Sequence, residues 1–354
     1  MLNKLIKTAI YNKGLTFTLT LVAIFAGWMS FQTLPIDAVP DITNVQVQVN
    51  TAVEGLIPEE IEKFITYPVE SEMGGIPDVD EIRSITRFGL SQVTIIFEEA
   101  TDIYRARQLV SEKLQSIKDD LPGRVQPKLG PITTGLGEIY FYALEAKKEA
   151  QGQKRLEQLM ELRAINEWLI KPRLLTVKGV AEVNAIGGYE KQYFVKPRLK
   201  DLSKYGIHLH EVVEAIERNN RNTGGGYIQQ TAEQLLIQAT GLVRSPKDIE
   251  GIVIKKLPNF RTVTVGDIAA VALDRELRTG AALVNGQESI IGTALMLLGE
   301  NSRTVALDIE DKIKEIKKSI PDWVKLETIY NRSELVNSTL GTVEKNLLFG
   351  AFLV

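Results

Sequence analysis

The hydrophobic positions of this chain form one long apolar run near its start, followed by short segments that repeat at strand or helix spacing. No charged side chain occurs from residue 15 to residue 34. A helix over these residues would be about 30 Å long, which is the thickness of the hydrocarbon core of a bilayer. The pattern therefore predicts a membrane-spanning helix.

The charges on either side of this run predict its orientation. Three lysines precede it, whereas Asp37 and Asp41 follow it. The positive-inside rule then places the N-terminus in the cytoplasm and the chain from Asp37 to about Lys345 outside it. A cleaved signal peptide is the alternative, but its apolar core is usually about 7–15 residues long and ends at a small-residue cleavage site. We favour a retained anchor because the run is longer and no such site follows it.

After a proline-containing elbow, the pattern predicts the order strand, helix, strand, strand, helix, strand, which is the split βαβ or ferredoxin-like order. We assign it to residues 37–134. The helix that begins at Pro58 would bury one face formed by Ile61, Phe64, Ile65 and Pro68. The predicted elements are an alternating strand at 45–50, a helix from Pro58, a hairpin at 82–97 with Gly89 in its turn, a helix capped by Asp102, and a tail strand that reaches Ile132.

The same order recurs later in the chain, where an insertion separates its two middle strands. We assign residues 135–188 and 276–333 to this second unit and residues 189–275 to an α+β insertion. The fold class is therefore a membrane helix plus an α+β region with two ferredoxin-like βαββαβ units, the second of them interrupted. The elements predicted for the second unit are strands at 139–144, 180–186, 289–298 and 324–330, a helix at 156–170 ending before Pro172, and a helix from Ser302.

Both ends of the chain carry membrane-type patterns. Residues 1–36 contain the N-terminal segment and the predicted first membrane helix, and residues 334–354 contain a polar lead-in and a second apolar run. That run stops after eight residues, 347–354. Because a half-span would leave backbone groups unsatisfied in lipid, we interpret the sequence as a fragment.

The composition excludes several chemistries. The chain has no cysteine and two histidines, which excludes thiolate catalysis, disulfides and cysteine-based metal sites. Its formal net charge of −3, without a basic run, argues against nucleic acid as a partner. His208 and His210 form an incomplete ligand set at the start of a predicted helix, so we do not assign them to a metal.

Several short motifs occur in order along the whole chain. With the order of the units, they resemble the N-terminal third of a resistance–nodulation–division (RND) efflux pump of the heavy-metal branch, particularly its cobalt–zinc–cadmium members. The motifs are Leu34-Pro35-Ile36-Asp37-Ala38-Val39-Pro40-Asp41, Thr66-Tyr67-Pro68, Phe88-Gly89, Ala100-Thr101-Asp102, Leu129-Gly130-Pro131, Thr134-Gly135-Leu136-Gly137-Glu138 and Gly299-Glu300-Asn301-Ser302.

The resemblance implies a proton-driven antiporter of the bacterial inner membrane that exports divalent cations, and not an enzyme. It implies a homotrimer bound to a periplasmic adaptor and an outer-membrane channel. The two βαββαβ units would be porter subdomains and the insertion a docking subdomain. The transported cation and the proton gradient would take the place of a bound cofactor, and the proton-relay carboxylates would lie on a later helix outside this chain.

The resemblance also implies a carboxylate metal ligand at Glu138, and Glu167 on the following helix is a second candidate. A carboxylate suits Zn²⁺ or Co²⁺, whereas Cu(I) prefers sulfur ligands. A solvated glutamate is the alternative for both positions. Asn331 is a departure, because the family usually has an aspartate after the preceding tyrosine, and an asparagine keeps the hydrogen bond but loses the charge.

The insertion contains a polar, glycine-rich segment at 219–228 that lacks the glycine spacing of a phosphate-binding loop. We interpret it as an extended loop or hairpin arm. The resemblance implies that such an arm holds a neighbouring protomer, and a mobile surface loop is the alternative. The residues assigned to this contact are Asn222, Gly224, Gly225, Gly226 and Tyr227.

Two other functions stay open from the sequence. A multidrug RND pump would share the fold but would have an apolar pocket lined by phenylalanine and tyrosine. A membrane-tethered periplasmic binding or sensor module would be complete as written, without further membrane helices.

Overall fold

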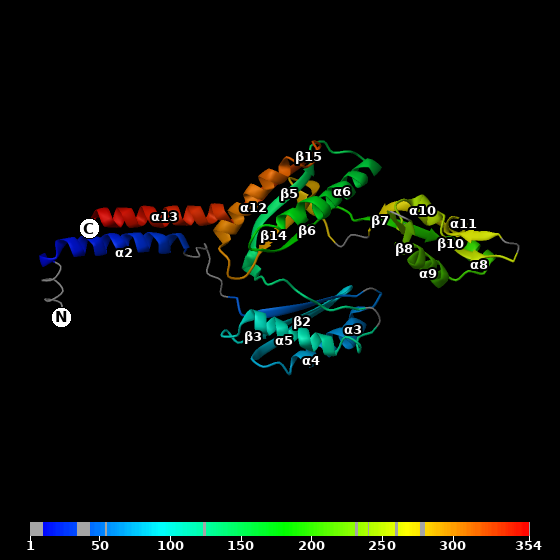
Figure 1. Ribbon diagram of the computed structural model, residues 1–354, viewed down its shortest axis with the longest axis horizontal. Coiled ribbons are helices and arrows are strands. Elements are labelled where there is room, and N and C mark those ends of the chain that lie inside the picture. The colour runs from blue at the N-terminus through cyan, green and yellow to red at the C-terminus, as the bar shows by residue number, and fades with distance from the viewer. Residues whose placement is uncertain are drawn as a thin grey trace.

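The structure is a computed structural model of the 354-residue chain. It describes residues 10–33, 43–53, 55–122, 125–230, 233–239, 241–258, 261–276 and 280–353. Figure 1 shows three β-containing units, with two long helices that extend from the same end of this assembly in the same direction. The predicted elbow at 34–42 lies outside the described residues.

The two extended helices are α2 (Lys13–Thr33) and α13 (Arg332–Leu353). Among the described residues, α2 is the one helix that is long and apolar enough to cross a membrane, and none of that segment is buried within the chain. The hydroxyl of Thr18 donates to the carbonyl of Gly14 at 3.0 Å and that of Thr20 to Thr16 at 2.9 Å. These hydroxyls are therefore satisfied within the helix and do not oppose an apolar environment.

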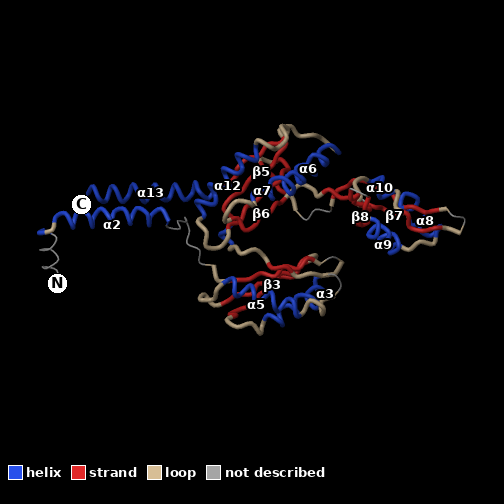
Figure 2. Tube along the Cα trace, viewed as in Figure 1, coloured by secondary structure: helices blue, strands red, loops and turns tan. Residues whose placement is uncertain are grey.

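The first unit contains an antiparallel sheet in the order β2-β3-β1-β4, which is the strand order of a split βαβ unit. Figure 2 shows this sheet between its own helices and the second unit. Its strands are β1 (Gln46–Ala52), β2 (Val79–Arg87), β3 (Leu90–Phe97) and β4 (Lys128–Leu129). Its helices are α3 (Pro58–Ile61), the π-helical η1 (Glu62–Thr66), α4 (Tyr67–Met73) and α5 (Ile103–Ser116).

The core of the first unit lies between the sheet and these helices. Val47 and Val49 of β1 are buried there, as the alternation in the sequence predicts. The Asp102 carboxylate accepts a hydrogen bond from the Arg105 backbone N–H at 2.8 Å, so it caps α5 as predicted. The predicted tail strand is reduced to the two residues of β4.

The second unit repeats this plan with the order β6-β14-β5-β15, and β13 pairs with residues 287–289 of β14, on the same side of that strand as β6. Its core is the largest hydrophobic cluster among the described residues. The strands are β5 (Glu138–Ala146), β6 (Val180–Ile186), β13 (Ala282–Val284), β14 (Gln287–Met296) and β15 (Val324–Asn331). The helices are α6 (Gln153–Ile165), the π-helical η3 (Asn166–Ile170), α7 (Lys171–Leu174) and α12 (Ser302–Lys317).

The π-helical segments explain two wrong predictions. Phe64 is 47% exposed instead of lying in the core with Ile61 and Ile65, because the wider turn of η1 rotates the buried face. The helix of the second unit also continues past Pro172 to the end of α7. Since the hydrogen-bond pattern changes at η3, Pro172 lies in the first turn of α7, where a missing N–H is tolerated.

The insertion forms a unit with its own core. Strands β7 (Lys191–Pro197) and β12 (Ala269–Arg275) pair in antiparallel fashion and carry the chain out of the second unit and back. The glycine-rich segment is part of the hairpin of β8 (Thr223–Gln230) and β9 (Glu233–Ala239). The other elements are α8 (Leu199–Tyr205), α9 (Leu209–Asn219), α10 (Pro246–Glu250), β10 (Val253–Lys256), β11 (Thr262–Thr264) and α11 (Val265–Ile268).

Candidate functional site

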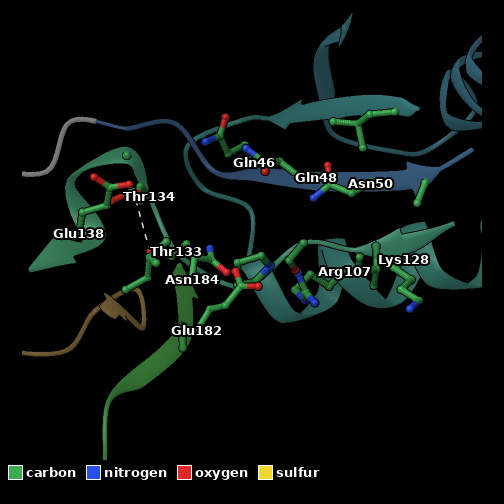
Figure 3. Close-up of a pocket in the computed structure, with 18 of the residues that line it drawn as sticks. Gln46, Gln48, Asn50, Arg107, Lys128, Thr133, Thr134, Glu138, Glu182 and Asn184 are labelled. Atoms are coloured by element: carbon green, nitrogen blue, oxygen red, sulfur yellow. Dashed lines mark hydrogen bonds between the residues drawn. The ribbon is translucent and has the colours of Figure 1, made fainter. Parts of the chain in front are cut away.

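A cleft of about 790 Å³ lies between the first and second units. One wall comes from β1 and β4, and the other comes from β5 and β6 (Figure 3). Alternate residues of β1 line this cleft, while the valines between them are buried against the helices. The cleft is therefore bounded by the faces of the two sheets that their own helices do not cover.

The wall formed by the first unit presents three carboxamides, Gln46, Gln48 and Asn50, in a row along β1 (Figure 3). Gln92 donates to the Gln48 side-chain carbonyl at 3.2 Å. Asn50 Oδ1 is buried and has no hydrogen-bond partner within the described part of the chain. A buried acceptor without a partner is costly, and this one lies on the strand that borders the cleft.

Two cationic side chains, Arg107 and Lys128, also line the cleft. The Arg107 guanidinium donates to the Gly130 carbonyl at 2.6 Å, which ties α5 to the segment that links the two units. Burial lowers the pKa of Arg107 from its ordinary value, but a guanidinium stays charged in proteins. A Cβ at Gly130 would lie 3.1 Å from the Gln48 Cβ, so a glycine allows the link to approach β1 closely.

The wall formed by the second unit presents two carboxylates, Glu138 and Glu182, together with Asn184 (Figure 3). Leu295 on β14 pairs with Glu138 of β5 on one side and with Glu182 of β6 on the other. Because adjacent strands are about 4.8 Å apart, the backbones of the two glutamates are about 10 Å apart. The β14 ladder also changes register on both sides of Leu295, and such bulges re-aim side chains near functional sites.

The turn before Glu138 explains the glycine that precedes this glutamate. Residues Gly135–Gly137 form one turn of 3₁₀ helix that leads into β5. A Cβ at Gly137 would lie 2.0 Å from the Thr133 hydroxyl and 3.2 Å from the Met296 carbonyl, so a larger residue here would force its neighbours to shift. Glu138 follows directly and is exposed to the cleft.

Glu167, the second candidate from the sequence, is not among the residues that line the cleft. Its carboxylate lies 3.2 Å from Arg163 and 3.5 Å from Lys171, which are neighbours on the same helix. The structure therefore does not bring Glu138 and Glu167 together. Among the described residues there is also no group of three or more histidine, aspartate or glutamate side chains that could hold a metal ion.

Glu182 and the carboxamides of β1 were not predicted as site residues from the sequence. The alternation along β1 does place its polar residues on one face. It could not show that this face lies against a second unit instead of bulk water. Glu182 lies in a strand with mixed exposure, and its position opposite Leu295 depends on long-range pairing.

The residues assigned to the arm of the insertion lie in or beside the hairpin β8–β9. Asn222 accepts hydrogen bonds from the backbone N–H groups of Gly241 at 3.1 Å and Leu242 at 3.3 Å, which closes the base of the hairpin. The pairing is irregular between Gly224 and Tyr227, and Gly226 has a positive φ of 81° that favours glycine. Tyr227 is 61% exposed, so its ring is accessible for a contact.

Comparisons with known proteins agree on one family. Residues 5–354 match the model of the AcrB/AcrD/AcrF family. Protein HelA of Legionella pneumophila is 50% identical over 354 residues, which are all of this chain and 34% of that protein. The cobalt-zinc-cadmium resistance protein CzcA of Cupriavidus metallidurans is 46% identical over 359 residues, which cover all of this chain and 33% of that protein.

A solved structure shows the same similarity. The crystal structure of a heavy metal efflux pump, crystal form I, aligns with a TM-score of 0.88 at 32% identity over 99% of this chain and 34% of that pump. The chain thus spans about a third of the length of the relatives that it matches.

Proposed function

Because the chain belongs to the AcrB/AcrD/AcrF family, we propose that it forms the N-terminal part of a proton-driven efflux transporter for divalent heavy-metal cations, and that it is not an enzyme. The observation that carries the choice of substrate is the cleft, in which Glu138 and Glu182 lie on either side of Leu295 and face carboxamides of β1. A multidrug transporter would need an apolar aromatic pocket. This lining supports a cation instead, because it supplies oxygen ligands.

The oxygen groups favour a borderline or hard cation such as Zn²⁺ or Co²⁺. Glu138 and Glu182 would attract the cation, and the carboxamide oxygens on the opposite wall would supply neutral ligands. Arg107 and Lys128 reduce the net negative charge of the cleft. A transport site must release its cargo, so weak binding by separated carboxylates suits passage better than a closed chelate.

The arrangement in the cell follows from the same proposal. Helix α2 would cross the inner membrane with its N-terminus in the cytoplasm, and residues from 37 to about 345 would be periplasmic. The two βαββαβ units would act as porter subdomains and the insertion as a docking subdomain. In a homotrimer, the β8–β9 hairpin would contact the neighbouring protomer, and the trimer would bind a periplasmic adaptor and an outer-membrane channel. The length, apolar composition and exposure of α2 support the membrane assignment.

The test removes one charge at a time from the full-length transporter. Glu138→Gln and Glu182→Gln should each lower the zinc or cobalt tolerance of cells, and the double variant should lower it further, because both carboxylates line the same cleft. Glu167→Gln is the matched control, since it makes the same change at a glutamate outside the cleft. The measurement is growth across a metal concentration series at equal membrane expression.

Two results would contradict this assignment. Unchanged metal tolerance in the double variant would remove the cleft carboxylates from the transport path. A loss of tolerance in Glu167→Gln alone would move the metal ligand to the helix face of the second unit.

A further inference from the structure

One buried amide joins three elements where the second unit continues into the long helix α13. Asn331, the last residue of β15, is 5% exposed. Its Oδ1 accepts hydrogen bonds from the Ser333 backbone N–H at 2.9 Å and from the Ser333 hydroxyl at 2.7 Å. Its Nδ2 donates to the Glu310 carboxylate of α12 at 2.9 Å. The same side chain therefore satisfies the first turn of α13 and contacts α12.

The chemistry of the partners fixes which end of the amide faces which group. The Ser333 N–H can only donate, so an oxygen must face it, and the ionised Glu310 carboxylate can only accept, so an N–H must face that group. A side chain with an acceptor and a donor on separate atoms meets this requirement, as the amide of Asn331 does. An aspartate could cap the helix but would place a second carboxylate against Glu310.

The surroundings make such a second negative charge unfavourable. From α12, Glu310 also accepts from Lys314 at 2.9 Å, and Lys314 contacts Asp311 at 3.0 Å. Arg332 and Glu334 lie in the first turn of α13, and Tyr140 of β5 is within electrostatic reach of Glu310, Lys314 and Glu334. This set contains three carboxylates, Glu310, Asp311 and Glu334, and two cations, Lys314 and Arg332, so a further carboxylate would add to an existing excess of negative charge.

A second contact lies on the next turn of α13. The Arg303 Nε near the start of α12 donates to the Asn337 side-chain carbonyl at 2.7 Å. Beyond these two contacts α13 leaves the unit, and its apolar residues such as Leu347 and Phe352 are largely exposed. Helix α12 packs on the second sheet, whereas α13 extends in the same direction as α2 (Figure 1).

We propose that Asn331 is a positioning residue that fastens α13 to α12. A displacement of the second unit is then transmitted to α13, and a displacement of α13 is transmitted to the second unit. The neutral amide is the required group because it faces Glu310. The use of this connection in transport rests on the proposed function, but the fastening itself does not.

The first test compares the same substitution at two asparagines, Asn331 at the end of β15 and Asn337 on α13. Asn331→Asp places a carboxylate against Glu310, whereas Asn337→Asp places one against the Arg303 guanidinium. In the full chain in detergent, we expect Asn331→Asp to lower the thermal unfolding midpoint by about 4 °C at neutral to alkaline pH. We expect a smaller shift at about pH 5, where two facing carboxylates can share a proton. Asn337→Asp should leave the midpoint within about 1 °C of the wild type.

The second test restores the hydrogen bond between residues 331 and 310 with the donor and the acceptor exchanged. In the double variant Asn331→Asp with Glu310→Gln, the glutamine amide can donate to the new carboxylate, so the midpoint should return and its pH dependence should disappear. Hydrogen exchange of the backbone amides at 332–336 should rise in Asn331→Asp and fall again in the double variant, because these amides report the fastening of the first turn.

The transport readout separates this inference from the proposed function. In the full-length transporter, Asn331→Asp should reduce metal tolerance at equal expression. The double variant Asn331→Asp with Glu310→Gln should recover this tolerance. A wild-type protein that confers no tolerance would overturn the proposed function, and the unfolding and exchange data would still decide the fastening. Equal effects of Asn331→Asp and Asn337→Asp, or no recovery in the double variant, would overturn the inference.

Discussion

The two βαββαβ units have the same strand order but divide the volume of their cores differently. In the first unit, Val49 on the central strand pairs with Val93. In the second unit, Tyr142 on the central strand β5 pairs with Gly292 of β14. Both pairs face the helices, so a large residue beside a glycine fills the space that two valines fill in the first unit. The comparison shows that one backbone plan accepts different side chains when the total volume is kept.

The two units also use different side chains to hydrogen-bond their π-helical segments to the sheet. In the first unit, the Thr66 hydroxyl bonds to the hydroxyls of Ser91 at 2.7 Å and Thr86 at 2.8 Å. In the second unit, the Tyr142 hydroxyl donates to the Asn166 side-chain carbonyl at 2.7 Å. Each π segment is thus tied to the sheet by a buried polar contact, and each is followed by a proline in the next helical turn.

The largest expected effect comes from making the second unit resemble the first at this position. A Cβ at Gly292 would lie 2.0 Å from the Tyr142 ring, so Gly292→Val should destabilise the chain by about 3 kcal/mol. Tyr142→Val combined with Gly292→Val recreates the valine pair of the first unit and should recover part of this loss. Urea unfolding of Gly292→Val, Tyr142→Val and the double variant measures the effect. Additive losses in the double variant would show that the two residues do not share one volume.

A smaller effect is expected from the hydrogen bonds of the two π segments. Tyr142→Phe leaves the buried Asn166 carbonyl without its donor and should lower the free energy of unfolding by about 2 kcal/mol. Thr66→Val is the matched change in the first unit. It should lower the free energy by about 1 kcal/mol, because Thr86 and Ser91 are cross-strand neighbours and can bond to each other. Equal losses in urea unfolding would contradict this difference.

The smallest effect is a difference in alkaline stability. Burial raises the pKa of Tyr142 and also that of Tyr140, whereas the core cluster described for the first unit contains no tyrosine. Above about pH 10 an unfolded tyrosine loses its proton while the buried one keeps it. Stability should therefore be unaffected below about pH 10 and should fall above it, by up to about 1.4 kcal/mol per pH unit for the deeply buried Tyr142.

The alkaline prediction is checked with Tyr142→Phe. Its free energy of unfolding should decline less steeply between about pH 10 and pH 11 than that of the wild type. The same decline in both proteins would exclude Tyr142 as a source of the pH dependence.

Much of the fold could be predicted because its signals are local. The valine alternation of β1 predicts a half-buried strand, and Asp102 at the start of α5 makes the predicted cap. Asn285 and Gly286 predict a hairpin turn, and both have the positive φ that such a turn needs, 52° and 80°. Each of these features depends on residues close together in the sequence.

Less of the candidate site could be predicted, because its members meet only through long-range pairing. Glu138 was identified through a family resemblance, and the sequence alone did not connect it with Glu182, which the register of β14 places on the other side of Leu295. Glu167 is as plausible as Glu138 by residue type. Only the structure shows that its helix carries it away from the cleft and against Arg163.

The sequence by itself determined where most strands and helices lie and, for regular elements such as β1, which face is polar, because the spacing of side chains along an element fixes its faces. The tertiary structure decided what each face meets. It placed the polar face of β1 against the second unit, paired Tyr142 with Gly292, and put the Asn331 amide between α12 and α13. These contacts join residues far apart in the sequence, so they depend on how whole elements pack and not on any local pattern.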